Sequence, residues 1–174
     1  MTTIELQNKE NDLCVIFLDM DGVMQPFNSS SFPRSTMHAL SFILQQVPSA
    51  KLVLSSTWRV KDSYIRLIEE QFEAFIDDDD ELTLKSVVFY DITNPHLHSE
   101  RQYEIQDWLE NKHKEQQHVV SWVALDDEEL LEGNVNQRLR NSFQGHVVKT
   151  DSHTGLTMED AQKAVQLLLR QLST

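Results

Sequence analysis

Short apolar runs alternate along this chain with segments whose apolar residues recur at the spacing of a helix, and this alternation limits the fold more than any other feature. The strand-like runs span residues 13–18, 51–54, 86–90, 119–125 and 146–149. The helix-period segments span residues 34–47, 61–76, 100–113 and 134–143, and a last one follows Thr157. Such alternation is typical of a mainly parallel sheet with helices on both faces. We therefore expect one α/β domain of the Rossmann-like, doubly wound kind, with a five-stranded sheet.

Local signals mark where three of these helices begin. Pro33 stands near the first turn of one helix, where its missing N–H group is tolerated. Ser99 with Gln102, and Thr157 with Asp160, have the spacing of a capping box. These signals predict helices that begin near residues 34, 100 and 158.

Two acids, Asp19 and Asp21, directly follow the first strand and precede Gly22. In open α/β sheets, ligands bind beyond the carboxyl ends of the strands. Residues i and i+2 of an extended segment point the same way, so both carboxyl groups can face one site. Gly22 permits a sharp turn away from that site. The pair alone is not specific, because sugar-nucleotide glycosyltransferases also use an Asp-x-Asp pattern.

Asp126 and Asp127 follow the fourth strand, which lies beside the first strand in the usual doubly wound order. Three or four carboxylates that converge at one sheet edge repel one another unless a cation lies between them. Oxygen ligands of this kind suit Mg²⁺. The alternative is a loop of solvated aspartates that cap a helix.

Hydroxyl and guanidinium groups suited to phosphate accompany these acids. Ser55 and Ser56 follow the second strand, and Arg101 stands in the first turn of the helix before strand four. The alternatives are a helix-capping role for the serines and a surface salt bridge between Arg101 and Glu100 or Glu104.

Taken in order, these segments resemble the four motifs of the haloacid dehalogenase (HAD) superfamily. The matching stretches are Phe17-Leu-Asp19-Met-Asp21-Gly-Val, Leu54-Ser55-Ser-Thr-Trp-Arg59, Arg101, and Leu125-Asp126-Asp127. The finer pattern is similar to HAD domains of Swiss Army Knife RNA-repair-like proteins, on the stretches Leu-Ser-Ser-Thr-Trp-Arg, Glu104-Ile-Gln-Asp-Trp-Leu109 and Gly155-Leu-Thr157. The resemblance covers roughly residues 13–170.

The resemblance implies a phosphatase, a phosphomonoester hydrolase that works in two steps. Asp19 would attack phosphorus and become an aspartyl phosphate, and Asp21 would protonate the leaving oxygen and later deprotonate water. Mg²⁺ would be held by the Asp19 carboxylate, the Asp21 backbone carbonyl and Asp126.

The resemblance also implies supporting roles. Ser55 or Ser56, together with Arg101, would bind the transferred phosphoryl group, and Asp127 would orient the metal shell or a metal-bound water. The family usually has lysine where this chain has Arg101, which keeps the charge but alters the hydrogen-bond geometry.

The spacing of the motifs leaves little room for an inserted cap. One helix accounts for the segment between the first two motifs, and one helix and one strand account for the next. We therefore expect a capless or minimally capped HAD-like hydrolase domain over residues 13–174, preceded by an N-terminal extension at residues 1–12. In the family, such an open site goes with bulky or polymeric phosphorylated substrates, including nucleic-acid ends and phosphoproteins.

The charge of the chain bears on its partners. A net charge of −13 disfavours stable binding to nucleic acid, so a small phosphorylated molecule or an exposed polymer end is expected. Trp58 is open to two interpretations, stacking on a base or packing in the core. The second function class that stays open is a catalytically quiet binding or effector module with the same fold.

The remaining features indicate no further site. Cys14 lies within an apolar run and is expected to be a buried, inert thiol. The acidic run 77–81 is interpreted as a solvated connection, and the histidines at 96, 98, 113 and 118 lack a ligand spacing. No membrane span or signal peptide is evident, so a cytoplasmic location is expected.

Overall fold

The computed structural model describes residues 12–75, 84, 87–95, 100–132 and 135–173. Its five strands pair side by side in the order β3-β2-β1-β4-β5, and every neighbouring pair is parallel. The strands are β1 (Asp12–Leu18), β2 (Ala50–Leu54), β3 (Asp91–Ile92), β4 (His118–Asp126) and β5 (Val147–Lys149). The expected α/β fold with a five-stranded sheet is confirmed.

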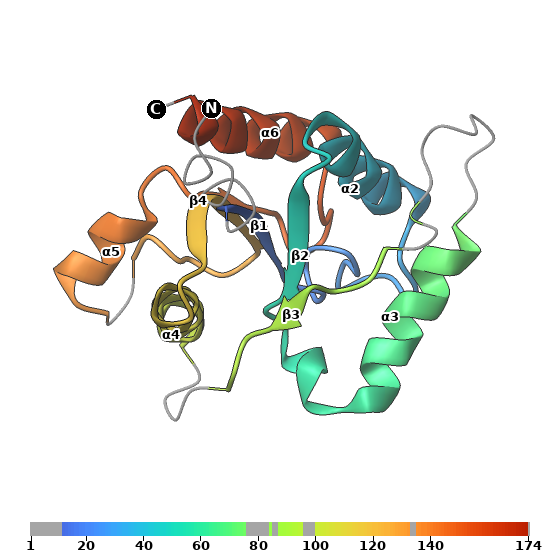
Figure 1. The fold of residues 1–174 in the computed structure, drawn as a ribbon. Helices are drawn as coiled ribbons and strands as arrows, with labels where there is room; N and C mark the ends of the chain where they lie inside the picture. Colours follow the sequence, from blue (N-terminus) through green and yellow to red (C-terminus); the bar gives the residue numbers. More distant parts are fainter. Residues whose placement is uncertain (1–11, 76–83, 85–86, 96–99, 133–134, 174) are drawn as a thin grey trace.

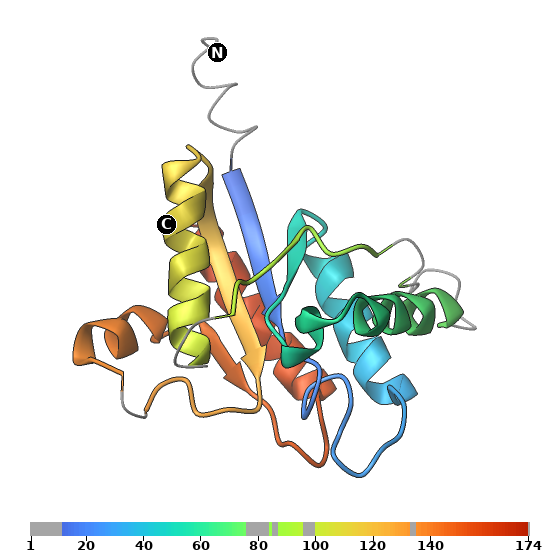
Figure 2. The ribbon, with the colours of Figure 1, turned by 90° about the horizontal axis from the view of Figure 1, so that it is seen from below.

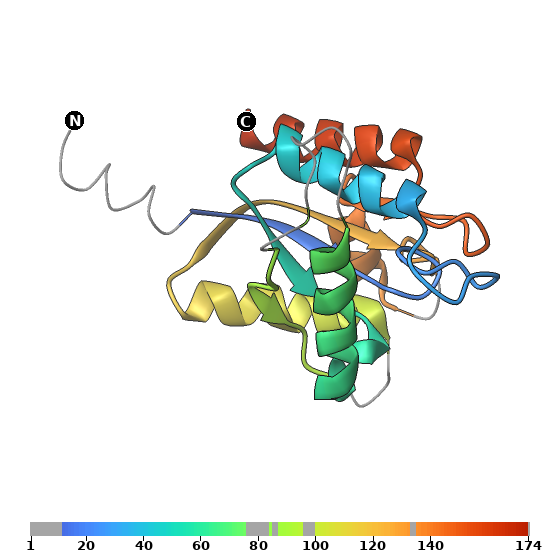
Figure 3. The same ribbon diagram turned by 90° about the vertical axis from the view of Figure 1, so that its right-hand side faces the viewer.

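Helices cover both faces of this sheet. They are α2 (Arg34–Gln46), α3 (Asp62–Ala74), α4 (Arg101–Lys114), α5 (Gln137–Phe143) and α6 (Met158–Leu172), with a short 3₁₀ helix, η1 (Thr57–Val60). Helices α2 and α6 form a layer on one face, and α4 lies on the other (Figures 1 and 3). Helix α5 lies on the far side of α4 from β2, and α3 stands beyond the β2–β3 edge (Figure 1).

Strand β1 is buried on both faces because its side chains alternate between two hydrophobic clusters. Cys14, Ile16 and Leu18 pack in the cluster under α2 and α6. The intervening Val15 and Phe17 pack in the cluster under α4 and α5. Cys14 is buried as expected, and burial raises the pKa of its thiol. The strand therefore forms the centre of the core, with its carboxyl end leading directly to Asp19.

The third strand was predicted wrongly at residues 86–90. The structure places β3 at Asp91–Ile92, and residues 87–90 belong to no strand. Val87 and Phe89 pack against the core, whereas Val88 is 70% exposed. The apolar alternation therefore reflects side-chain packing of an extended segment. That segment reaches hydrogen-bonding distance of β2 only at the end of the apolar run.

Of the capping boxes predicted at the starts of helices, the structure confirms one. Thr157 and Asp160 form the expected capping box at the start of α6. Helix α4 begins at Arg101, and its N-cap residue Glu100 makes no capping hydrogen bond through its side chain. Ser99 lies outside the described residues, as do the acidic run 77–81 and the histidines at 96 and 98. Among the helices described, none has the length and apolar character needed to cross a membrane.

The connections that follow β1, β4 and β5 meet at the carboxyl end of the sheet (Figures 2 and 3). Strands β1 and β4 are neighbours, as the doubly wound order required. Between β1 and β2, the structure contains a loop over residues 19–33 and helix α2. This arrangement places the predicted acids at one sheet edge.

Candidate active site

Four strands change from apolar to polar at the same level of the sheet. Leu18 is in register with Leu54 of β2 and with Leu125 of β4, and Leu54 is in register with Ile92 of β3. The next residue on each of these strands is polar and buried: Asp19, Ser55, Asp126 and Thr93. We call these four residues the polar row. Because in-register side chains point to the same face, the row faces α4, opposite the α2/α6 layer.

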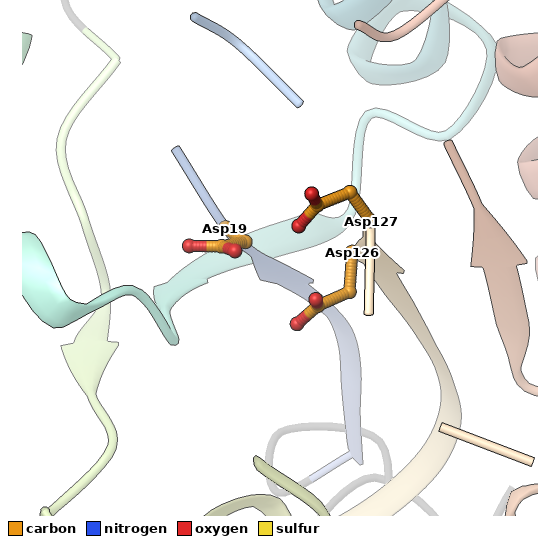
Figure 4. Close-up of side chains that lie close together, drawn as sticks. All are labelled: Asp19, Asp126 and Asp127. Atoms are coloured by element: carbon orange, nitrogen blue, oxygen red, sulfur yellow. The ribbon is translucent and has the colours of Figure 1, made fainter. Parts of the chain in front are cut away.

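Asp19, Asp126 and Asp127 form a compact group of carboxylates. Each offers one oxygen, and these oxygens lie within 4.8 Å of one another. Figure 4 shows the three side chains together, Asp19 from the end of β1 and the two others from the end of β4. The backbone N–H of Asp19 donates to the carbonyl oxygen of Leu125 at 3.1 Å, which fixes the two strand ends to each other. The predicted convergence of acids is therefore present.

Arg101 is the cation at this group, and it is buried rather than on the surface. Its Nε donates to Asp126 Oδ2 at 2.9 Å, and its Nη2 lies 3.4 Å from Asp19 Oδ2. The side chain is 5% exposed. The structure thus excludes an isolated surface salt bridge for Arg101, although Glu104 Oε2 does lie 3.4 Å from its Nη1.

Glu104 connects Arg101 to a second buried arginine. Its Oε1 accepts from Nη2 of Arg59, while its Oε2 faces Arg101. Arg59 in turn donates from Nη1 to the carbonyl oxygen of Ser56 at 2.6 Å. This chain of contacts fixes Arg101 from the side opposite the acids, and it ties α4 to the residues after β2.

The buried acids near Arg101 outnumber it, and their pKa values reflect this. Burial raises the pKa of Asp126 to about 8, because desolvation together with repulsion from Asp19 outweighs the attraction of Arg101. Burial likewise raises the pKa of Asp19, again against the attraction of Arg101. A divalent cation would neutralise such a group, and an all-carboxylate set of hard oxygen donors suits Mg²⁺. The residues present therefore fit the ion.

The two serines after β2 differ in their contacts. The hydroxyl of Ser56 accepts from the backbone N–H of Trp58 at 3.4 Å and hydrogen-bonds to Asp19. The hydroxyl of Ser55 is fully buried and, among the described residues, has no hydrogen-bond partner. A buried hydroxyl without a partner is costly, so Ser55 is the serine with free capacity to bind an added oxygen. The capping role falls to Ser56, which begins η1.

Asp21 stands outside the three-carboxylate group, although, besides burial, its charge contributes to raising the pKa of Asp127. Its Oδ2 accepts a hydrogen bond of 2.8 Å from Nε1 of the Trp58 indole, 37 residues away in sequence. The carboxylate is half-buried, unlike that of Asp19. Trp58 therefore contacts the predicted acid–base residue directly, which neither a stacking nor a core-packing interpretation of the sequence contained.

Gly22 makes the turn after Asp21 and leaves room for Asp127. Its φ is 72°, a left-handed conformation that favours glycine. A Cβ atom at this position would lie 2.4 Å from Cγ of Asp127. The third residue of the carboxylate group therefore packs directly on the glycine backbone.

Sequence reasoning named a contact between Arg101 and Glu104 only as a surface salt bridge, whereas the structure buries it. It missed two contacts of this site, the bond from Trp58 to Asp21 and the pairing of Arg59 with Glu104. The spacing of Arg101 and Glu104, one helical turn apart, is what made their contact predictable. The Trp58 and Arg59 contacts carried no such signal, because they join segments far apart in sequence.

A surface hollow of about 410 Å³ lies elsewhere, between α4 and α5. Leu109 and Trp122 supply its apolar lining, and His113 and Lys114 stand at its border. It contains no group of acids among the described residues. Within the part of the chain that the structure describes, the group of three potential metal ligands at the carboxyl end of the sheet therefore remains the candidate site.

Comparison with known proteins gives one match. A family model described as the HAD domain in Swiss Army Knife RNA repair proteins matches residues 15–161. The match spans all four motif segments and most of the chain. Neither curated proteins nor solved structures gave a significant match.

Proposed function

The chain belongs to the family of HAD domains found in Swiss Army Knife RNA repair proteins, and on that premise we propose that it is a Mg²⁺-dependent phosphatase. The observation that carries the proposal is the group formed by Asp19, Asp126 and Asp127, whose oxygens lie within 4.8 Å, with Arg101 in contact with two of them. A glycosyltransferase that used only the Asp19–Asp21 pair would leave this group and Arg101 without a role.

In the first step, an oxygen of Asp19 bonds to phosphorus as the bond from phosphorus to the leaving oxygen breaks. Asp21 transfers its proton to that leaving oxygen. In the second step, water attacks the aspartyl phosphate while Asp21 takes a proton from the water. The phosphorus–Asp19 bond breaks, inorganic phosphate is released, and Asp21 is protonated again.

The remaining residues bind and orient the reacting group. Arg101 and the Ser55 hydroxyl would donate hydrogen bonds to phosphoryl oxygens, where charge accumulates in the transition state. The carboxylates of Asp19 and Asp126 and the backbone carbonyl of Asp21 would hold Mg²⁺, with Asp127 beside them. The ion would supply positive charge that neutralises nucleophile and phosphate together.

The decisive experiment measures hydrolysis of a simple aryl phosphate with and without Mg²⁺. We expect the activity to require Mg²⁺ and to fall by more than about 1,000-fold in Asp19→Asn, because no other nucleophile replaces the carboxylate. Asp12→Asn is a matched control, since it changes the same residue type at the opposite end of β1. Activity that persists in Asp19→Asn would disprove the mechanism.

For the substrate, we propose phosphate on a nucleotide or on an exposed polynucleotide end. Trp58 contacts Asp21, its ring lies 5.5 Å from that of Tyr64, and Lys61 lies 5.1 Å from the Tyr64 ring, so an aromatic pair with a cation against it begins at Asp21. Such groups can stack on a base and contact a backbone phosphate. The net charge of −13 favours short substrates over long duplexes.

A panel of phosphates tests this substrate class. It compares phosphate release from nucleotides, oligonucleotide ends, sugar phosphates and phosphopeptides in the presence of Mg²⁺. Higher kcat/KM on nucleotides or oligonucleotide ends than on sugar phosphates is expected. If kcat/KM on nucleotides and oligonucleotide ends is equal to or lower than that on sugar phosphates, the proposed substrate class is wrong, whereas the proposed phosphatase activity still stands.

A further inference from the structure

We propose that Trp58 is a positioning residue that determines which oxygen of Asp21 exchanges the proton with the leaving group. The inference rests on the proposed phosphatase function and goes beyond it, because it assigns roles to the two oxygens of one carboxyl group. It is carried by the 2.8 Å hydrogen bond from the Trp58 indole to Asp21 Oδ2.

The indole is held from several sides, so its N–H group has a defined direction. Its ring centroid lies 6.0 Å from that of Phe32 and 5.5 Å from that of Tyr64. Its backbone N–H donates to the hydroxyl of Ser56. The next residue, Arg59, is buried and anchored to the Ser56 carbonyl oxygen and to Glu104. Trp58 therefore forms a rigid support for a half-buried carboxyl group.

The chemistry of an indole makes this support directional. Its N–H group donates a hydrogen bond and accepts none. Asp21 Oδ2 must therefore be the acceptor in both protonation states, and when Asp21 is protonated its proton resides on Oδ1. Among the described residues, no other side-chain hydrogen bond restrains the Asp21 carboxyl group. Trp58 thus leaves Oδ1 as the oxygen that gives the proton in the first step and takes it in the second.

Loss of the hydrogen bond between Trp58 and Asp21 should lower kcat/KM only for substrates whose leaving oxygen needs a proton. An alkoxide is a poor leaving group and requires protonation, whereas 2,4-dinitrophenolate leaves without it. The kcat/KM value reports the steps up to phosphoryl transfer to Asp19, so the hydrolysis of the intermediate does not obscure the comparison. If Trp58 had a purely structural role, its replacement would lower kcat/KM for both substrates by the same factor.

The experiment compares kcat/KM for glycerol phosphate and for 2,4-dinitrophenyl phosphate, with Mg²⁺, in the wild type and in Trp58→Phe. We expect Trp58→Phe to lose at least about 10-fold in kcat/KM on glycerol phosphate and less than about 3-fold on the aryl ester. The first loss is a part of the roughly 100- to 10,000-fold that general acid catalysis contributes, because Asp21 itself remains. Equal losses on both substrates, or no loss on either, would overturn the inference.

Two further variants separate the hydrogen bond from packing. Trp108→Phe is the matched control, because the Trp108 indole makes a similar bond of 2.9 Å to Asp91 Oδ2 away from the site. It should leave the ratio between the two substrates unchanged. Site-specific replacement of Trp58 by benzothienylalanine keeps the ring shape but lacks the N–H group, and it should reproduce the selective loss even if Trp58→Phe folds poorly. An unchanged ratio in this isostere also contradicts the inference.

The same data distinguish failure of the inference from failure of the proposed function. If the wild type hydrolyses both esters with Mg²⁺ and loses this activity in Asp19→Asn, the phosphatase stands whatever Trp58 does. If the wild type hydrolyses neither ester, the proposed function fails, and the role of Trp58 fails with it.

Discussion

The hydroxyl of Thr150 donates a hydrogen bond of 2.8 Å to the carbonyl oxygen of Gly22, across 128 residues of sequence. Two backbone bonds accompany it: Phe27 N–H donates to the carbonyl of Ser152 at 2.9 Å, and Leu156 N–H to that of Val23 at 2.8 Å. The connection after β5 therefore holds the loop that carries Asp21. The last part of the chain fixes the geometry of the first.

Thr150→Val should destabilise the protein, because it leaves the buried carbonyl oxygen of Gly22 without this donor. We expect the free energy of unfolding to fall by about 1–3 kcal/mol. Denaturation in urea measures the change. Thr154→Val is the control, since its hydroxyl bond to Asp151 is exposed, and it should cost less than about 0.5 kcal/mol. Similar losses in the two variants would contradict the role of Thr150.

Gly22→Ala should cost more than Gly145→Ala, although both glycines have a positive φ, of 72° and 80°. An added Cβ meets nothing within 4 Å at Gly145, so only the backbone penalty of about 1–2 kcal/mol applies there. At Gly22, the same Cβ also collides with Asp127. Urea denaturation of both variants, and of Gly22→Ala combined with Asp127→Ala, measures the additional loss of stability that the collision causes. The double variant should recover part of the loss, and additive losses would exclude the collision.

Glu104→Gln should destabilise the protein by about 3–5 kcal/mol, the usual cost of leaving a buried charge without its partner. Glu104 is buried and faces Arg59 and Arg101 with its two oxygens. Arg101 keeps Asp19 and Asp126 after the change, so the loss of counter-charge falls mainly on Arg59. Urea denaturation again measures the change. Glu110→Gln, on the exposed surface of the same helix, should cost less than about 0.5 kcal/mol. A loss below about 1 kcal/mol in Glu104→Gln would show that the arginines do not depend on it.

Mg²⁺ should stabilise the folded protein independently of any activity, because it relieves the repulsion among Asp19, Asp126 and Asp127. At an ion concentration 100 times its dissociation constant, the gain is about 2.7 kcal/mol. Thermal denaturation across a magnesium series measures it. Asp126→Asn should abolish most of this gain, and Asp12→Asn should retain it. Equal stabilisation of both variants would place the ion elsewhere.

Stability should fall in mild acid because of His146. Its ring stacks on Trp122 at 4.2 Å, and burial lowers the pKa of this histidine, against the opposing hydrogen bond to the Trp122 carbonyl oxygen. The folded state therefore binds a proton less readily than the unfolded state. This contribution is complete above the unfolded pKa of about 6.5 and is lost as the pH falls through that value towards the folded pKa. The midpoints of urea denaturation of the wild type and of His146→Gln, measured over this pH range, test the contribution of His146. If the midpoints of the two proteins change in parallel with pH, His146 does not cause the loss of stability.

The sequence was sufficient to predict those parts of the molecule that depend on the local pattern of apolar and polar residues. The ends of β1, β2 and β4 lie within one residue of their predicted positions, because each apolar run ends where a polar side chain follows. Asp19, Asp126 and Asp127 could be placed together once the strand order was inferred. The two-residue β3 was missed because its polar Asp91 interrupts the apolar pattern that marks the other strands.

The contacts of the site lay beyond the reach of sequence patterns. The bond between Trp58 and Asp21 spans 37 residues, and the pair of Arg59 and Glu104 spans 45. Each depends on the position of η1 or α4 against the sheet, which neither propensity nor spacing determines. The distinction between Ser55 and Ser56 likewise needed the direction of each side chain after the end of β2.

Because the polar row is formed by residues at the ends of neighbouring strands, the candidate site assembles only when these strands pair in the correct register. Asp19, Ser55 and Asp126 come together only because three strands, each formed from a different part of the chain, end at a common height. Since a slip of one residue turns every side chain of a strand to the opposite face, a misaligned strand would direct its polar group into the apolar layer beneath α2 and α6. An incorrectly paired intermediate is therefore both unstable and inert. Insertions or deletions within these strands should be tolerated far less than changes of equal length in the connecting loops.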